Sequence, residues 1–206
     1  AETAIEIPET IDNMPVTEIA EQAFLESPIT AVKIGKNIRE IGELAFGVCK
    51  KLSSVTWNQK CDVVPAFCFS ECSNLTKFDF SNVKKIGLYA FYKSGLQEVY
   101  LTEKIEILDK GTFSGCSKLQ SVTWHCQCDV IPNACFERCS NLKQFDLSNV
   151  KKIEERAFIY SGLTSVTLSK KNEVDQNCFA YCNDLEKIEW LSGRSIEGDI
   201  FEECQN

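Results

Sequence analysis

Phenylalanine recurs along this chain at an almost constant interval, and this spacing constrains the fold more than any other feature. Neighbouring members of the series are 21 to 23 residues apart. The series consists of Phe24, Phe46, Phe69, Phe91, Phe113, Phe136, Phe158, Phe179 and Phe201. A repeat of this length is typical of a solenoid, in which each repeat forms one coil and packs only on its neighbours.

A second apolar pattern follows each phenylalanine by about five or six residues. It has the form L-x-x-V-x-L, as in Leu96, Val99 and Leu101. Alternation with a period of two predicts a strand with one buried face. A small residue such as Ala45 or Ala90 directly precedes the phenylalanine. There we expect a short turn or a helical turn, so that stacked coils form a parallel sheet and a continuous column of aromatic rings.

A longer repeat overlies the short one. The segments Leu52–Gly95 and Leu119–Gly162 are similar along their whole length and are offset by 67 residues, which is three coils. We therefore interpret residues 1–206 as a single solenoid domain. Residues 1–28 form an irregular N-terminal coil in this interpretation, and residues 29–206 form eight regular coils in a three-coil super-repeat.

Several segments resemble the repeats of the BspA-like leucine-rich-repeat proteins. The similarity is carried by IREIGELAFGVCKKL at 38–52, IEILDKGTFSGCSKL at 105–119 and the opening IEIPETIDNMPVTEIAEQAF at 5–24. It covers essentially the whole chain. The resemblance implies a leucine-rich-repeat solenoid: a right-handed superhelix of about nine coils of 21–23 residues, with a parallel β-sheet on the concave face and short strands, turns and helical turns elsewhere.

The same resemblance implies a role. Proteins of this family are typically found at the cell surface or are secreted, in bacteria and some protozoa. They are implicated in adhesion to host or matrix proteins or to other microbes. Their similarity to this chain therefore implies a protein partner, with the extracellular matrix and host surfaces as the candidates.

Charge and hydropathy exclude other classes of partner. The formal net charge is −8, with acidic and basic residues interspersed. Such a chain is repelled by phosphate backbones and by anionic lipid, so we expect no nucleic-acid partner. No apolar run approaches the roughly 18 residues of a membrane helix, so we expect no membrane insertion. The first residues carry no export signal.

Twelve cysteines are the unusual feature of the composition. Eleven fall in repeat columns, where other coils carry Ala, Ser or Ile, so small buried packing residues are the favoured interpretation. Disulfides between adjacent coils are the alternative, because stacking brings certain cysteines close together. The candidate pairs are Cys49 with Cys72, Cys116 with Cys139, and Cys182 with Cys204.

His125, Cys126 and Cys128 form the only cluster that suggests metal or thiol chemistry. Structural zinc requires four ligands, usually in two separated pairs, and this chain has no second histidine. Cysteine catalysis requires a base and a group that orients it. Neither arrangement is evident, so the sequence predicts no enzyme, no cofactor and no metal site.

The outward positions of the strands are the predicted ligand-binding residues, because solenoids commonly bind partners along an extended sheet face. They are Lys33, Thr56, Lys77, Asp79, Glu98, Tyr100, Thr123, Gln144, Asp146, Thr167, Lys187 and Glu189. A face kept polar only for solubility would have the same composition.

The sequence thus predicts a non-catalytic binding or adhesion module at the cell surface or in a secreted protein, acting through the concave sheet. Three alternatives remain open. The chain could be a structural spacer, or an intracellular scaffold segment of a larger protein. It could also be a redox or metal protein that depends on Cys126 or His125.

Overall fold

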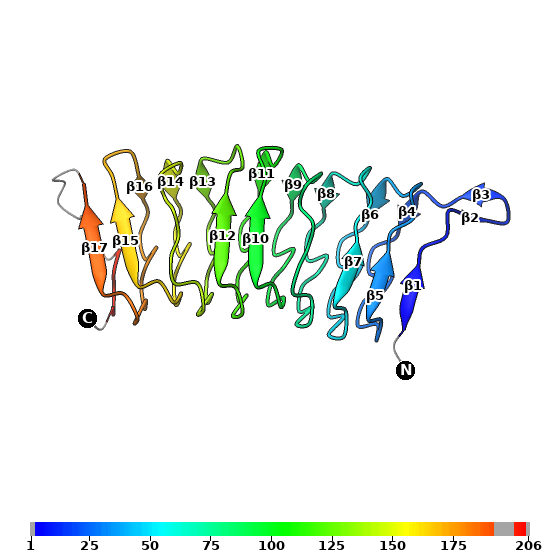
Figure 1. Ribbon diagram of the computed structural model, residues 1–206, viewed down its shortest axis with the longest axis horizontal. Helices are drawn as coiled ribbons and strands as arrows, with labels where there is room; N and C mark the ends of the chain where they lie inside the picture. The colour runs from blue at the N-terminus through cyan, green and yellow to red at the C-terminus, as the bar shows by residue number, and fades with distance from the viewer. Residues whose placement is uncertain (1–2, 192–199, 205–206) are drawn as a thin grey trace.

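The computed structural model describes residues 3–191 and 200–204, which form an elongated stack of coils (Figure 1). The chain runs from β1 at one end of the stack to β17 near the other end, so successive coils are neighbours in space. The predicted domain also includes residues 1–2, 192–199 and 205–206, which lie outside the described residues.

One side of the stack carries the strands that the L-x-x-V-x-L pattern predicts. They are β1 (Ala4–Glu6), β5 (Ala31–Lys33), β7 (Ser54–Thr56), β10 (Glu98–Leu101), β12 (Ser121–Trp124), β15 (Ser165–Leu168) and β17 (Lys187–Trp190). Paired strands are parallel and in register, with Val32 opposite Val55 and Val99 opposite Val122. The valines pack on the core, and side-chain alternation turns their neighbours outward. The predicted parallel sheet is confirmed, and we call this side the strand face.

A second side of the stack carries shorter strands. They are β4 (Glu18–Ile19), β6 (Glu40–Ile41), β8 (Val63–Val64), β9 (Lys85–Ile86), β11 (Ile107–Leu108), β13 (Val130–Ile131), β14 (Lys152–Ile153) and β16 (Glu173–Val174). Exposed ion pairs connect adjacent coils here, such as Lys84 with Asp62 at 3.1 Å and Lys151 with Asp129 at 2.7 Å. Because these pairs are exposed to solvent, each contributes little to the stability of the fold.

The segment that carries each phenylalanine is a turn whose backbone N–H groups alternate between two kinds of acceptor. Every second N–H group donates to a carbonyl of its own segment and closes a turn: Cys68 N–H donates to Pro65 O, and Ser70 N–H donates to Phe67 O. The other N–H groups donate to the next coil: those of Phe67, Phe69 and Glu71 bond to the carbonyls of Leu88, Ala90 and Tyr92. In a helix, every N–H group would donate to a carbonyl of the same segment. The described residues accordingly contain no helix, and these turns replace the expected helical turns.

The phenylalanine rings stack in one continuous column through the stack. Successive ring centroids are 5.3 to 5.8 Å apart. The rings of Phe46 through Phe179 are fully buried, whereas Phe24 and Phe201 at the two ends of the column are half-buried. Eight steps connect the nine rings from Phe24 to Phe201, so the array makes about eight turns from the first ring to the last.

All twelve cysteines are free, and nine of them are buried. Six lie three residues after a phenylalanine, and their thiols donate to the phenylalanine carbonyl of the preceding coil. The bond from Cys49 Sγ to Phe24 O, for example, is 3.0 Å long. The thiol is thus a small apolar group with a weak donor, which agrees with the packing interpretation rather than with disulfides.

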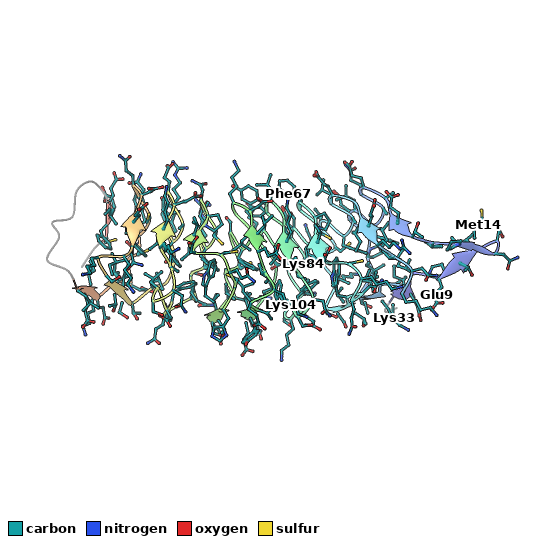
Figure 2. The ribbon with its side chains drawn as sticks, turned by 90° about the horizontal axis from the view of Figure 1, so that it is seen from above. Glu9, Met14, Lys33, Phe67, Lys84 and Lys104 are labelled. Carbon is teal, nitrogen blue, oxygen red and sulfur yellow. The ribbon has the colours of Figure 1, made fainter. Side chains whose placement is uncertain are left out.

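The N-terminal coil differs from the rest by a hairpin of β2 (Thr10–Ile11) and β3 (Met14–Pro15). Asp12 and Asn13 connect these strands with φ values of 51° and 63°. Two consecutive left-handed residues are the geometry of a two-residue hairpin turn, and Asp and Asn tolerate it well. The hairpin extends beyond the end of the stack, and Met14 lies at its outer end (Figure 2).

Candidate functional site

The strand face is the surface on which the sequence places ligand-binding residues. All twelve predicted residues are exposed or half-buried there. Strand pairing sets Lys33 beside Thr56, Tyr100 beside Thr123, and Thr167 beside Glu189. The twelve are spread along the whole face rather than gathered in one site, because each coil contributes one or two of them.

The strand face is interrupted at two places, one in each copy of the three-coil block. Residues 75–80 and 142–147 follow the same pattern as the strands but form no strand in the described structure. The predicted residues Lys77 and Asp79 lie in the first interruption, and Gln144 and Asp146 lie in the second.

An additional aromatic ring explains these interruptions. Phe78 and Phe145 occupy the inward position that valine has in other coils. Phe145 packs between column members, with its centroid 5.3 Å from that of Phe136 and 5.1 Å from that of Phe158. It also contacts Trp124 of the preceding coil at 5.7 Å. Phe145 and Trp124 thus occupy an interior that aliphatic side chains fill in other coils. The backbone therefore departs from regular strand pairing.

A local hydrogen bond ends each interrupted segment. Asp146 Oδ1 accepts from the Ser148 amide at 2.9 Å, and Asp79 Oδ1 accepts from the Ser81 amide at 2.9 Å. Such Asx turns compete with strand pairing. The bond to Ser148 also lowers the pKa of Asp146, so its carboxylate is ionised at neutral pH.

A groove of about 1180 Å³ lies over the second interruption, between β12 and β15. Its apolar lining comes from Val122, Phe145 and Leu147. Polar side chains surround this lining: Gln120, Ser121, Gln144, Asp146, Ser148, Ser165, Thr167 and Ser169, with Lys170, Lys171, Asn172 and Leu191 completing the groove. Three of the twelve predicted residues, Gln144, Asp146 and Thr167, therefore meet at one site.

A buried asparagine fixes one end of the groove. Asn172 Nδ2 donates to Leu147 O at 3.3 Å and to Val150 O at 2.7 Å. Its Oδ1 accepts from the Ser169 amide at 2.7 Å and from the Ser169 hydroxyl. Because the bonds to Leu147 and Val150 are buried, they hold the loop of Lys170 and Lys171 in a defined position beside the groove.

The candidates for thiol or metal chemistry are also placed by the structure. Burial raises the pKa of Cys61 to about 11 and that of Cys116 to about 12, so these thiols are protonated at neutral pH and poorly nucleophilic. Cys126 and Cys128 share a hydrogen bond that raises the pKa of Cys126 and lowers that of Cys128. Within the described residues, no three or more His, Cys, Asp or Glu side chains are arranged to hold a metal ion.

Sequence reasoning missed a second surface, at the turns that carry the phenylalanine column. Its residues lie two before or one to two after a column phenylalanine, and include Phe67, Tyr89, Tyr92, Lys93, Arg138, Tyr160 and Tyr181. The turn positions repeat with the same spacing as the strand columns, so the repeat in the sequence indicates these aromatic and cationic side chains.

A family model of the BspA-type leucine-rich-repeat region matches this chain in six copies, over residues 3–120 and 80–186. The chain belongs to this family. As a BspA-type repeat protein, it has the repeat length, the phenylalanine position and the parallel stacking that the resemblance implied. No curated protein matches its sequence significantly.

Solved structures similar to this BspA-type chain are bacterial leucine-rich-repeat proteins. A protein from Bacteroides ovatus is 24% identical, with a TM-score of 0.74 over 98% of this chain and 61% of its own. One from Treponema, named T. pallidum leucine-rich-repeat protein, is 24% identical, with a TM-score of 0.70 over 89% of this chain and 78% of its own. A protein from Faecalibacterium prausnitzii, described as a leucine-rich cell surface protein, is 26% identical, with a TM-score of 0.64 over 93% and 48%.

These comparisons also give the extent of the match. The chain spans about 61% of the length of the Bacteroides ovatus protein. Within the described residues, there is no apolar helix of membrane-spanning length. The shared property of the similar proteins is therefore the repeat fold itself.

Proposed function

We propose that this chain is a non-catalytic binding module of a cell-surface or secreted protein, and that it takes a protein partner on the strand face. The groove between β12 and β15 is the observation that carries the proposal. In the adhesion role that we assign, the partner is a host, matrix or microbial protein.

The composition of the groove supports a protein partner. Val122, Phe145 and Leu147 supply apolar area, and serine, threonine and glutamine side chains surround it. An apolar centre with a polar rim is the usual anatomy of a protein–protein interface. Buried hydrogen bonds of Asn172 hold one end in place, which lowers the entropy lost on binding.

The family supports the same conclusion. Leucine-rich-repeat solenoids use extended surfaces to bind other proteins. The similar Faecalibacterium prausnitzii protein is described as a cell surface protein, and we extend that location to this chain as part of the proposal.

The groove can be tested with the residues that an equivalent strand carries. In the strand that follows the first three-coil block, Glu98 and Tyr100 stand where Ser165 and Thr167 stand here. We would measure binding of the purified chain to immobilised collagen, laminin and fibronectin and to cultured host cells. The double substitution Ser165→Glu with Thr167→Tyr should weaken binding by about tenfold or more, because it fills the groove.

The matched control is Ser54→Glu with Thr56→Tyr, which makes the same changes in the same two columns on β7. Because Thr56 also lies on the strand face but outside the groove, this control should weaken binding much less than the groove variant does. Equal loss in both variants would contradict a role for the groove. If the unsubstituted chain binds none of these proteins or cells, the spacer alternative is favoured instead.

A further inference from the structure

The turns that carry the phenylalanine column form an edge that lies away from the strand face, and we call it the turn edge. Phe67 marks it in Figure 2, on the opposite side of the stack from Lys33 and Lys104. Among the described residues, those two before and two after a column phenylalanine have positive φ, as Phe67 (54°) and Lys93 (51°) do. The described coils therefore repeat the same two turn positions along the turn edge.

One coil has glycine at both of these positions. Gly111 and Gly115 have φ values of 63° and 73°. A Cβ atom on Gly111 would lie 2.1 Å from Tyr89 Cε1, and one on Gly115 would lie 2.7 Å from Lys93 Cγ. The two glycines thus make room for side chains of the preceding coil. They leave a gap in an otherwise continuous row of side chains.

A notch of about 270 Å³ occupies this gap. Its aromatic walls are Phe67, Tyr89 and Tyr92, and its cationic walls are Lys93 and Arg138. Ser114, Gly115 and Glu137 complete the lining. The Phe67 and Tyr89 rings stack at 5.6 Å, and Tyr92 meets Tyr89 edge-on at 5.6 Å, so the aromatic wall is held by ring contacts.

Two cations line the notch, Lys93 and Arg138, together with one carboxylate, that of Glu137. Lys93 Nζ lies 4.9 Å from the centre of the Tyr92 ring, and no ion pair of Lys93 occurs within the described residues. Arg138 lies 5.2 Å from the Tyr160 ring, and its one ion pair among the described residues is with Glu137, at 3.6 Å. Tyr92 raises the pKa of Lys93, helped by Glu71, whereas the nearby Arg138 acts in the opposite direction. Two cations that repel each other favour an anion between them.

We propose that the notch binds an acidic segment of a partner protein, with a carboxylate side chain between Lys93 and Arg138 and an adjacent apolar or proline residue against Tyr89 and Tyr92. Arginine binds carboxylates through two parallel hydrogen bonds. Tyrosine and arginine are the residues that most often dominate binding energy at interfaces. Aromatic-lined grooves also accept extended proline-containing segments. This second surface is independent of the groove on the strand face.

The test uses an array of fluorescent ten-residue peptides that combine Asp or Glu with Phe, Tyr or Pro, together with matched peptides in which every acid is replaced by its amide. Binding to the full chain is measured by fluorescence anisotropy. We expect acidic peptides to bind at least about tenfold more tightly than their amide counterparts, and more weakly as salt is raised.

The double variant Lys93→Gln with Arg138→Gln should lose at least about tenfold in affinity for the acidic peptides. Arg39→Gln with Lys50→Gln removes the same positive charge from exposed positions elsewhere and should change little. The proposal is overturned if no acidic peptide binds, if acidic and amide peptides bind alike, or if both double variants lose affinity equally. Binding of heparin in place of every peptide would assign the notch to anionic polysaccharides and would also overturn it.

Discussion

The two copies of the three-coil block, residues 52–95 and 119–162, share an interior and differ on their surface. In both, a tryptophan indole donates to a cysteine carbonyl four residues later: Trp57 to Cys61 at 2.8 Å and Trp124 to Cys128 at 2.9 Å. In both, an additional phenylalanine contacts the column member of its neighbouring coil at 5.3 Å. Duplication thus preserved the packing that closes the coil.

The difference lies beside the interrupted segment. The second block has Leu147 where the first has Phe80, whose ring packs 4.9 Å from Phe78. The strand that follows the second block carries Ser165 and Thr167 where the corresponding strand after the first carries Glu98 and Tyr100. Smaller side chains at these places leave the groove open. The comparison teaches that shared interior residues fix the frame of each coil, while one inward and two outward positions decide where a partner can fit.

The largest expected effect tests the shared interior. Phe69→Ala and Phe136→Ala each remove a fully buried ring that stacks on two neighbours. Each substitution should lower the free energy of unfolding by about 3–5 kcal/mol, measured by urea denaturation. The cost of removing a buried ring depends on its surroundings, and these two rings have equivalent surroundings. The two losses should therefore agree within about 1 kcal/mol. A much larger loss in one block would contradict an equivalent interior.

A smaller effect tests the surface difference by transferring it. The substitutions Phe80→Leu, Glu98→Ser and Tyr100→Thr give the first block the side chains that surround the groove. We expect a second binding site for the same partner, seen by isothermal titration calorimetry as a stoichiometry that rises from one to two. The inward Phe80 substitution alone serves as the control. Should the triple variant keep a single site, features beyond these three residues define the groove.

The smallest expected effect compares two thiols at equivalent positions. Burial raises the pKa of Cys61 to about 11, whereas the hydrogen bond from Cys126 lowers the pKa of Cys128. The thiolate is the reactive form, so Cys128 should be alkylated by iodoacetamide at pH 8 before Cys61, and this advantage should persist as pH falls. Peptide mass spectrometry gives the order of labelling. In Cys126→Gln, which introduces the residue found at Gln59, Cys128 should become as slow as Cys61; unchanged labelling would contradict the hydrogen bond as the cause.

Much of the frame could be predicted from particular residues. The phenylalanine spacing predicted the column, and the valines of L-x-x-V-x-L predicted the inward side of the strands. Cysteines that alternate with Ser and Ala favoured buried packing residues, with disulfides between coils as the alternative. The outward list contained Gln144, Asp146 and Thr167, although nothing in the sequence singled out these three from the other nine.

The remaining features could not be predicted because they depend on contacts between coils. Whether residues 142–147 form a strand depends on how Phe145 and Trp124 share one space. The notch depends on Gly111 and Gly115 lying beside Tyr89 and Lys93, which precede them by 22 residues. The non-helical turns depend on N–H groups that find acceptors in the next coil.

The sequence by itself determined the repeat, the parallel stacking and the identity of the buried residues. Burial recurs with the period of the coil, so residue type at each repeat position is sufficient to specify it. Only the tertiary structure decided where the surface is hollow and which charges face each other. Those properties arise from the sizes of side chains that stacking brings together from different coils, and a periodic pattern carries no information about such differences.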